Sequence, residues 1–105
     1  MKKIYLFVFN PAVKGDDAVL GFLDSRQEIA DWHAFPRGVF LVTDLSSEPL
    51  RDLIREGTGL EWFILTELRL DELGTSLSGW LPRASWEFLG RYAGDAWPKS
   101  RKQPA

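Results

Sequence analysis

Cysteine is absent from this sequence, and histidine occurs only once, at His33. Without cysteine the chain has no disulfide, no thiolate nucleophile and no cysteine-based zinc site. His33 has no nucleophile or orienting partner at a characteristic spacing, so we expect it to have a structural or surface role. A glycine-rich phosphate loop and a Ser-His-Asp order are also missing. No apolar run approaches the roughly 20 residues of a membrane span. We therefore expect a cytoplasmic protein that does not bind a membrane.

Apolar and aromatic residues, by contrast, are plentiful. They make up 45% and 13% of the 105 residues, which is too much for a disordered chain and fits one small domain with a packed core. We predict a single domain over residues 1–94, followed by a flexible basic tail over residues 95–105 that contains Pro98 and Pro104.

Charge is distributed unevenly along the chain. Lys99, Arg101 and Lys102 all lie in the tail, so residues 1–98 carry 10 basic and 15 acidic groups, a formal charge of −5. Tight binding of duplex DNA depends on clustered Lys and Arg that neutralise phosphates. The charge of the body therefore does not favour nucleic acid as a partner, although the tail could contact an acidic one.

Apolar spacing predicts strand, helix, strand, strand, helix, strand, and then a C-terminal helix. We place the strands at 3–9, 28–35, 39–43 and 60–68, and the helices at 16–25, 46–57 and 83–92. The segment 28–35 is interpreted as an edge strand, with continuation of the preceding helix as the alternative. Ser46 and Ser47 are expected to cap the second helix, and Gly57 to end it.

This order is that of an α+β, ferredoxin-like βαββαβ fold with an antiparallel-type sheet and two helices on one face. In that arrangement the first and third strands form the central pair. From the right-handed sense of helical crossovers we expect these two strands to run parallel to each other.

The first strand is apolar on both of its sides. Because side chains alternate along a strand, Tyr5, Phe7 and Phe9 point one way, and Ile4, Leu6 and Val8 the other. Two helices on one face leave the other face open, and a large open apolar face indicates an interface. We predict a homodimer through the face that carries Tyr5, Phe7 and Phe9. The C-terminal helix, with Trp86, Leu89 and Ala93 on one side, is the competing cover, and both covers can operate together.

The chain also resembles a known family. The resemblance is carried by the strand Tyr5-Leu6-Phe7-Val8-Phe9-Asn10, the hairpin from Trp32 to Thr43, the cap Leu45-Ser46, and Gly79-Trp80-Leu81-Pro82 with Trp86. These segments resemble small bacterial proteins of the "SinR family", which are related in fold to the CRISPR-associated "Cas two" proteins and to VapD-type toxins. In the nuclease members, a carboxylate at the end of the first strand of each protomer binds a divalent metal. Asn10 stands at that position here, and its neutral amide binds Mg²⁺ less well than a carboxylate.

A metal site, for Mg²⁺ or Mn²⁺, would have to use the acidic residues that remain nearby. If the central strands are parallel, Asn10, Asp16, Asp17 and Asp44 all lie at one edge of the sheet and are the candidate metal-binding and catalytic residues. Each also has an ordinary explanation: Asp16 and Asp17 suit a helix N-terminus, and Asp44 and Asn10 suit turns.

Three functions stay open. The first is a non-catalytic interaction module, for example in a toxin–antitoxin context; the second is a metal-dependent endonuclease or endoribonuclease. The third is a ligand-binding regulatory domain with a cavity lined by Tyr5, Phe7 or Trp62. The five tryptophans could stack on bases, but core and dimer packing also explain them. Arg51 and Arg55 could hold a phosphate, and a solvated helix face is the alternative.

Overall fold

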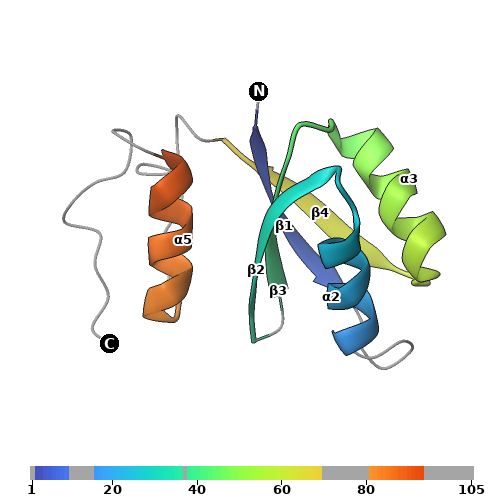
Figure 1. Ribbon diagram of the computed structural model, residues 1–105, viewed down its shortest axis with the longest axis horizontal. Coiled ribbons are helices and arrows are strands. Elements are labelled where there is room, and N and C mark those ends of the chain that lie inside the picture. The colour runs from blue at the N-terminus through green and yellow to red at the C-terminus, as the bar shows by residue number, and fades with distance from the viewer. Residues whose placement is uncertain (1, 10–15, 37, 70–80, 94–105) are drawn as a thin grey trace. The chain divides into compact units, whose positions relative to one another are not determined.

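The computed structural model describes residues 2–9, 16–36, 38–69 and 81–93 (Figure 1). In chain order its elements are β1 (Lys3–Phe9), α2 (Asp16–Ser25), β2 (Ile29–Phe35), β3 (Gly38–Thr43), α3 (Ser47–Thr58), β4 (Phe63–Leu68) and α5 (Arg83–Ala93). The expected order of strands and helices is therefore confirmed. The chain divides into two compact units, Met1–Glu67 and Leu68–Ala105, which are described separately below. The single domain over residues 1–94 stays a prediction, and the tail 95–105 lies outside the described residues.

The four strands form an antiparallel sheet with the order β2-β3-β1-β4. The fold is therefore α+β, and the first and third strands are its central pair, as expected. Their predicted parallel sense is wrong, because β1 and β3 pair antiparallel, with Lys3 opposite Thr43 and Phe7 opposite Val39. The reason is the connection: a helix joins β1 to β2, and a tight turn then reverses the chain, so β3 runs against both.

The segment 28–35 is an end strand, as predicted, rather than a continued helix. β2 pairs antiparallel with β3 from Ile29 opposite Thr43 to Phe35 opposite Gly38. The register shifts between Ile29 and Asp31, which is a β-bulge or similar irregularity near the start of the strand.

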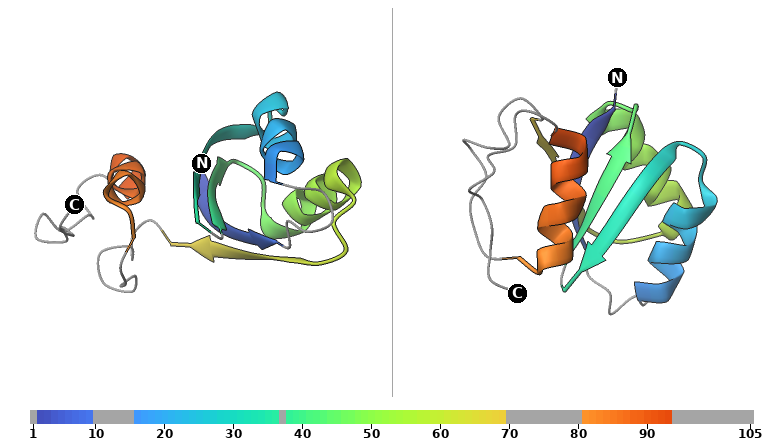
Figure 2. Two further views of the ribbon diagram at one scale, coloured as in Figure 1. Left: turned by 90° about the horizontal axis from the view of Figure 1, so that it is seen from below. Right: turned by 60° about the vertical axis from the view of Figure 1, so that its left-hand side comes forward.

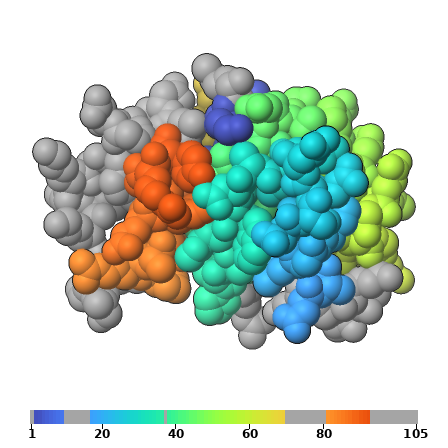
Figure 3. All heavy atoms as spheres, viewed as in Figure 1, coloured from blue at the N-terminus to red at the C-terminus, as the bar shows by residue number. Residues whose placement is uncertain are grey.

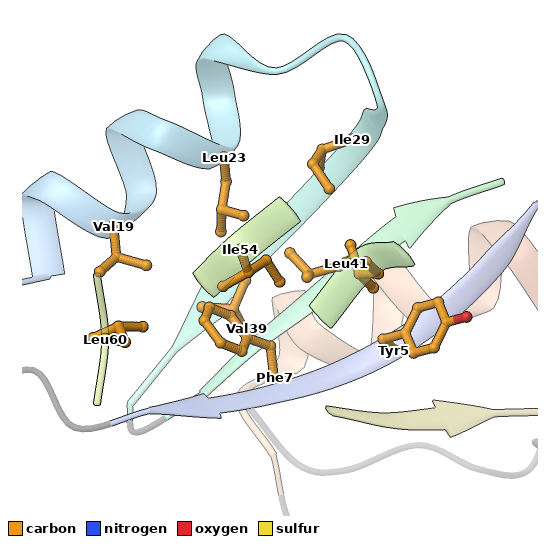
Figure 4. Close-up of a cluster of buried hydrophobic side chains, with 10 residues drawn as sticks. Tyr5, Phe7, Val19, Leu23, Ile29, Val39, Leu41, Ile54 and Leu60 are labelled. Atoms are coloured by element: carbon orange, nitrogen blue, oxygen red, sulfur yellow. The ribbon is translucent and has the colours of Figure 1, made fainter. Parts of the chain in front are cut away.

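The core of the first unit lies between the sheet and the two helices α2 and α3. Figure 2 shows both helices on the same side of the sheet, and Figure 4 shows side chains of β1, β3 and the helices pointing toward one another. The buried cluster contains the following residues: Tyr5, Phe7, Val19, Leu23, Ile29, Val39, Leu41, Leu50, Ile54 and Leu60. Tyr5 and Phe7 are fully buried and Phe9 packs against the cluster, so the helices cover the side of β1 that we expected to be open.

The other side of the sheet is only partly exposed. Ile4, Phe40 and Val42, which alternate with the core residues of β1 and β3, have relative exposures of 0%, 3% and 0% within a single chain. The exposed large apolar residues among those described are Trp62, just before β4, and Ile64, within it. The apolar surface that stays accessible is therefore at the β4 end of the sheet rather than across its centre.

Helix α3 begins and ends slightly differently from the prediction. Ser46 occupies the N-cap position, but its side chain makes no capping hydrogen bond. The helix ends at Thr58 and is capped by Gly59, whose φ of 68° lies in the left-handed region that glycine adopts readily, and whose N–H donates to the Arg55 carbonyl. Gly57 is not the stop. It lies inside the helix, where a Cβ atom would come within 1.9 Å of Cε1 of Phe22 in α2.

In the second unit, α5 agrees with the predicted helix 83–92. Pro82 precedes it, and its carbonyl accepts hydrogen bonds from the N–H groups of Ser85 and Trp86. The buried residues of α5 are Ser85, Trp86, Phe88 and Leu89, so Phe88 joins the predicted stripe of Trp86 and Leu89. The side chain of Ala93 lies outside the described residues.

Candidate functional site

The predicted acidic site is not assembled at one end of the sheet. Asp44 follows β3, and its Oδ2 lies 3.7 Å from Nζ of Lys2, just before β1 begins. Because β1 and β3 are antiparallel, Asp44 and the last residue of β1, Phe9, lie at opposite ends of a strand about 20 Å long. Figure 1 shows β3 leaving the sheet close to the start of β1.

The other three candidates follow the far end of β1. Asp16 and Asp17 open α2, as predicted for acidic residues at a helix N-terminus, and the Asp17 side chain is exposed. The side chain of Asp16, and Asn10 as a whole, lie outside the described residues. No group of three His, Asp or Glu side chains in the described part of the chain is placed to hold a metal ion. Asp44 therefore does not join Asp17 in a single site within one chain.

The proposed ligand cavity is not formed by the residues named for it. Tyr5 and Phe7 are fully buried on the helix side of the sheet, whereas Trp62 is 54% exposed. Phe63 and Leu65 of β4 pack against the core cluster, so by alternation Ile64 points to the opposite side. Figure 3 shows α2 and β2 lying against each other over the first unit. Tyr5, Phe7 and Trp62 therefore do not line one cavity.

Tyr5 has a structural role at the end of β3. Its hydroxyl donates to the Leu45 carbonyl at 2.8 Å, and the Thr43 hydroxyl donates to the Glu28 carbonyl at 2.6 Å. Burial raises the pKa of the Tyr5 hydroxyl, and the nearby negative charge of Glu67 raises that pKa further. Tyr5 and Thr43 thus fix the chain where it leaves the sheet towards α3.

The remaining candidates have packing or surface partners. The indole N–H of Trp32 donates to Oδ1 of Asp24 at 3.2 Å, and Trp32 packs against the core cluster. Nε of Arg51 lies 3.0 Å from Oδ1 of its neighbour Asp52, on an exposed helix face. His33 is half-buried on β2, opposite Phe40. Trp80 and Trp97 lie outside the described residues.

The most distinctive surface of the described residues is on β4. Trp62, just before the strand, is 54% exposed, Ile64 is 61% exposed, and Thr66, on the same side of β4 as Ile64, is also exposed. We call these three residues the β4 strip. Alternation along the predicted strand 60–68 puts all three on one side, but it does not indicate that this side is exposed. The signal was the position of this strand as the last of the βαββαβ order, since such a strand ends the sheet.

Comparisons with known proteins add no relative. No family model matches the chain, and neither a curated protein nor a solved structure matches it. Among the helices of the described residues, none has the length and apolar character that crossing a membrane requires.

Proposed function

We propose that this protein is a non-catalytic interaction module that binds a second copy of itself, built on a ferredoxin-like topology. The sheet order β2-β3-β1-β4 and the position of α2 and α3 on one side of the sheet support that topology. The observation that carries the function is the exposure of Trp62 and Ile64, two large apolar side chains at the start of an end strand. Exposed apolar residues that cluster in this way are characteristic of interaction sites.

The composition of the strip suits a protein partner. Tryptophan is enriched among the residues that contribute most to protein interfaces, because it brings a large apolar area at a small loss of conformational freedom. The flanking residues Glu61 and Glu67 are exposed and acidic. Their charge does not favour contact with phosphate groups, which agrees with the acidic balance of the body.

Sedimentation equilibrium over a wide range of protein concentration tests this proposal. We expect the wild-type chain to be in a monomer–dimer equilibrium, and Trp62→Ser to weaken the dimer by more than about tenfold, as at other interface tryptophans. Ala34→Ser, at an exposed position of β2, is the matched control and should leave the equilibrium unchanged. A wild-type chain that stays monomeric at the highest concentration, or a Trp62→Ser variant that associates normally, contradicts the proposal.

The non-catalytic part has its own test. Purified protein is incubated with RNA or DNA and Mg²⁺ or Mn²⁺, and we expect no cleavage above that of a matched Asp44→Ala preparation. Cleavage that disappears in Asp44→Ala would establish a nuclease instead.

A further inference from the structure

The residues from Trp62 to Thr66 have the composition of a segment that stacks with copies of itself. These five residues are aromatic, aliphatic or β-branched, and none of them is charged, proline or glycine. Windows of about five to seven residues with high β-propensity, low net charge and no proline are prone to form open-ended β-sheets when they are exposed. We call residues 62–66 the stacking segment.

The stacking segment lies at an end of the sheet. In the order β2-β3-β1-β4, the strand β4 is hydrogen-bonded to one neighbour, β1. β1 and β3 are also apolar, but they are central strands, so both of their edges are paired within the sheet. The other end strand, β2, is interrupted by the carboxylate of Asp31. Among the described strands, β4 therefore combines an uncharged apolar run with an end position.

Two exposed carboxylates enclose the stacking segment. Glu61 directly precedes it and Glu67 directly follows it, and both residues are exposed. By alternation Glu67 lies on the same side of β4 as Phe63 and Leu65, which pack against the core cluster. Its negative charge raises the pKa of the buried Tyr5, in agreement with this placement. A charge on the inward side of an end strand is one of the features by which proteins prevent strand addition.

The spacing of the two carboxylates opposes stacking in either strand direction. In a parallel, in-register stack each residue lies about 4.8 Å from its own copy, so Glu61 faces Glu61 and Glu67 faces Glu67 in every layer. In an antiparallel stack aligned on residues 62–66, Glu61 faces Glu67 instead. Like charges that are directly opposed destabilise strand pairs, and this repulsion is repeated with each added chain. Arg69, exposed just after β4, also faces its own copy in the parallel stack.

We propose that Glu61 and Glu67 keep association of this chain finite. Once β4 has separated from β1, the two carboxylates prevent the stacking segment from joining those of further copies in an open-ended sheet. A pair of chains contains at most one such contact, whereas a growing stack contains one in every layer, so the charges act mainly against the stack. The inference goes beyond the proposed function, because it holds whether or not the folded chain dimerises.

Aggregation kinetics of the full chain test this proposal. Glu61→Gln/Glu67→Gln removes both charges, and we expect the lag time of thioflavin T fluorescence at neutral pH to shorten by more than about fivefold. Mass spectrometry after proteolysis should find residues 62–66 in the protected core of the fibrils. Glu48→Gln/Glu56→Gln, at two exposed positions of α3, is the matched control. Both variants change the formal net charge from −2 to 0, but the control should alter the lag time by less than about twofold.

Glu61→Lys/Glu67→Lys separates charge repulsion from any other role of the two carboxylates. Like charges again face one another in either stack, so its lag time should stay close to that of the wild type. The proposal is overturned if the glutamine variant aggregates no faster than its control, if the lysine variant aggregates as fast as the glutamine variant, or if the fibril core excludes residues 62–66. Sedimentation of the soluble glutamine variant, which retains Trp62 and Ile64, reports on the proposed function separately. A monomer that then aggregates as expected contradicts the dimer alone.

Discussion

The two end strands of the sheet, β2 and β4, leave different groups exposed. β2 pairs with β3 from Ile29 to Phe35 with one register shift between Ile29 and Asp31, and its Trp32 is hydrogen-bonded to Asp24 of α2. β4 packs Phe63 and Leu65 against the core but leaves Trp62 and Ile64 more than half exposed. One end of the sheet thus contacts α2 through Trp32, whereas the other retains exposed large apolar side chains. The open end is where an interaction function is to be sought.

Replacing Trp32 or Trp62 by alanine should give the largest difference in stability between the two end strands. Trp32→Ala removes a half-buried side chain that packs on the core, and we expect it to lower the free energy of unfolding by about 2–3 kcal/mol, somewhat less than for a fully buried tryptophan. Trp62→Ala removes an exposed side chain and should change that free energy by less than about 0.5 kcal/mol in the monomer. Urea unfolding at low protein concentration measures both. Equal losses of unfolding free energy in the two variants would contradict the conclusion that Trp32 packs on the core and Trp62 does not.

A lysine introduced on β4 should weaken dimerisation, whereas a lysine introduced on β2 should not. Ile64→Lys introduces an ammonium group into the β4 strip, and we expect dimerisation to weaken by about thirtyfold or more, because the charge would be desolvated on pairing. Ala34→Lys introduces the same charge at an exposed position of β2 and should leave dimerisation unchanged. Analytical ultracentrifugation of the two variants distinguishes the edges, and a weaker dimer for Ala34→Lys would point to β2 instead.

Helices α2 and α3 contact each other. Because α2 also contacts β2 and α3 precedes β4 in the chain, this helix contact connects the elements next to the two end strands. Gly57→Ala places a methyl group against the ring of Phe22, and we expect a net loss of about 1 kcal/mol from overpacking. Gly21→Ala, in α2, meets no atom within 4 Å and should stabilise the protein by about 0.5–1 kcal/mol. Thermal unfolding tests the pair. If Gly57→Ala were also stabilised, the Phe22 ring would have moved away from the new methyl group, and the expected overpacking would be contradicted.

The smallest effect concerns Tyr5, on the strand next to β4. Tyr5→Phe removes the hydrogen bond to the Leu45 carbonyl and should cost about 1 kcal/mol at neutral pH. Because the pKa of Tyr5 is raised in the folded protein, its hydroxyl stays protonated at pH values where the unfolded chain already ionises. The stability from Tyr5 is therefore complete below the ordinary tyrosine pKa of about 10 and falls as the pH rises above it. The difference between wild type and Tyr5→Phe should shrink above pH 10 in urea titrations.

The order of the helices and strands could be predicted from the sequence, but the choice of sheet face could not. Alternation in β1 and the cap and turn residues around α2, β3 and α3 were sufficient to locate these elements. β1 has large apolar residues on both sides, so its pattern could not say that the helices would cover Tyr5 and Phe7 rather than Ile4. Gly57 and Gly59 are both plausible ends for α3, and only the left-handed backbone at Gly59 separates them.

The candidate site was less predictable because it depended on the direction of one strand. The crossover rule governs strands joined by a helix, here β1 and β2, whereas the prediction of a parallel pair applies it to β1 and β3. With β3 reversed, Asp44 moves to the opposite end of the sheet and lies beside Lys2. Ile64 and Trp62 could be placed on one side of a strand from alternation alone. Their exposure required knowing that β4 ends the sheet.

Backbone amide hydrogen exchange as a function of protein concentration tests the central claim most directly, because it reports both end strands in one experiment. We predict that amides of β4 become protected as concentration rises, while amides of β2 exchange at an unchanged rate. Protection that appears in β2 rather than β4, or exchange in β4 that stays constant while the protein dimerises, would contradict the account.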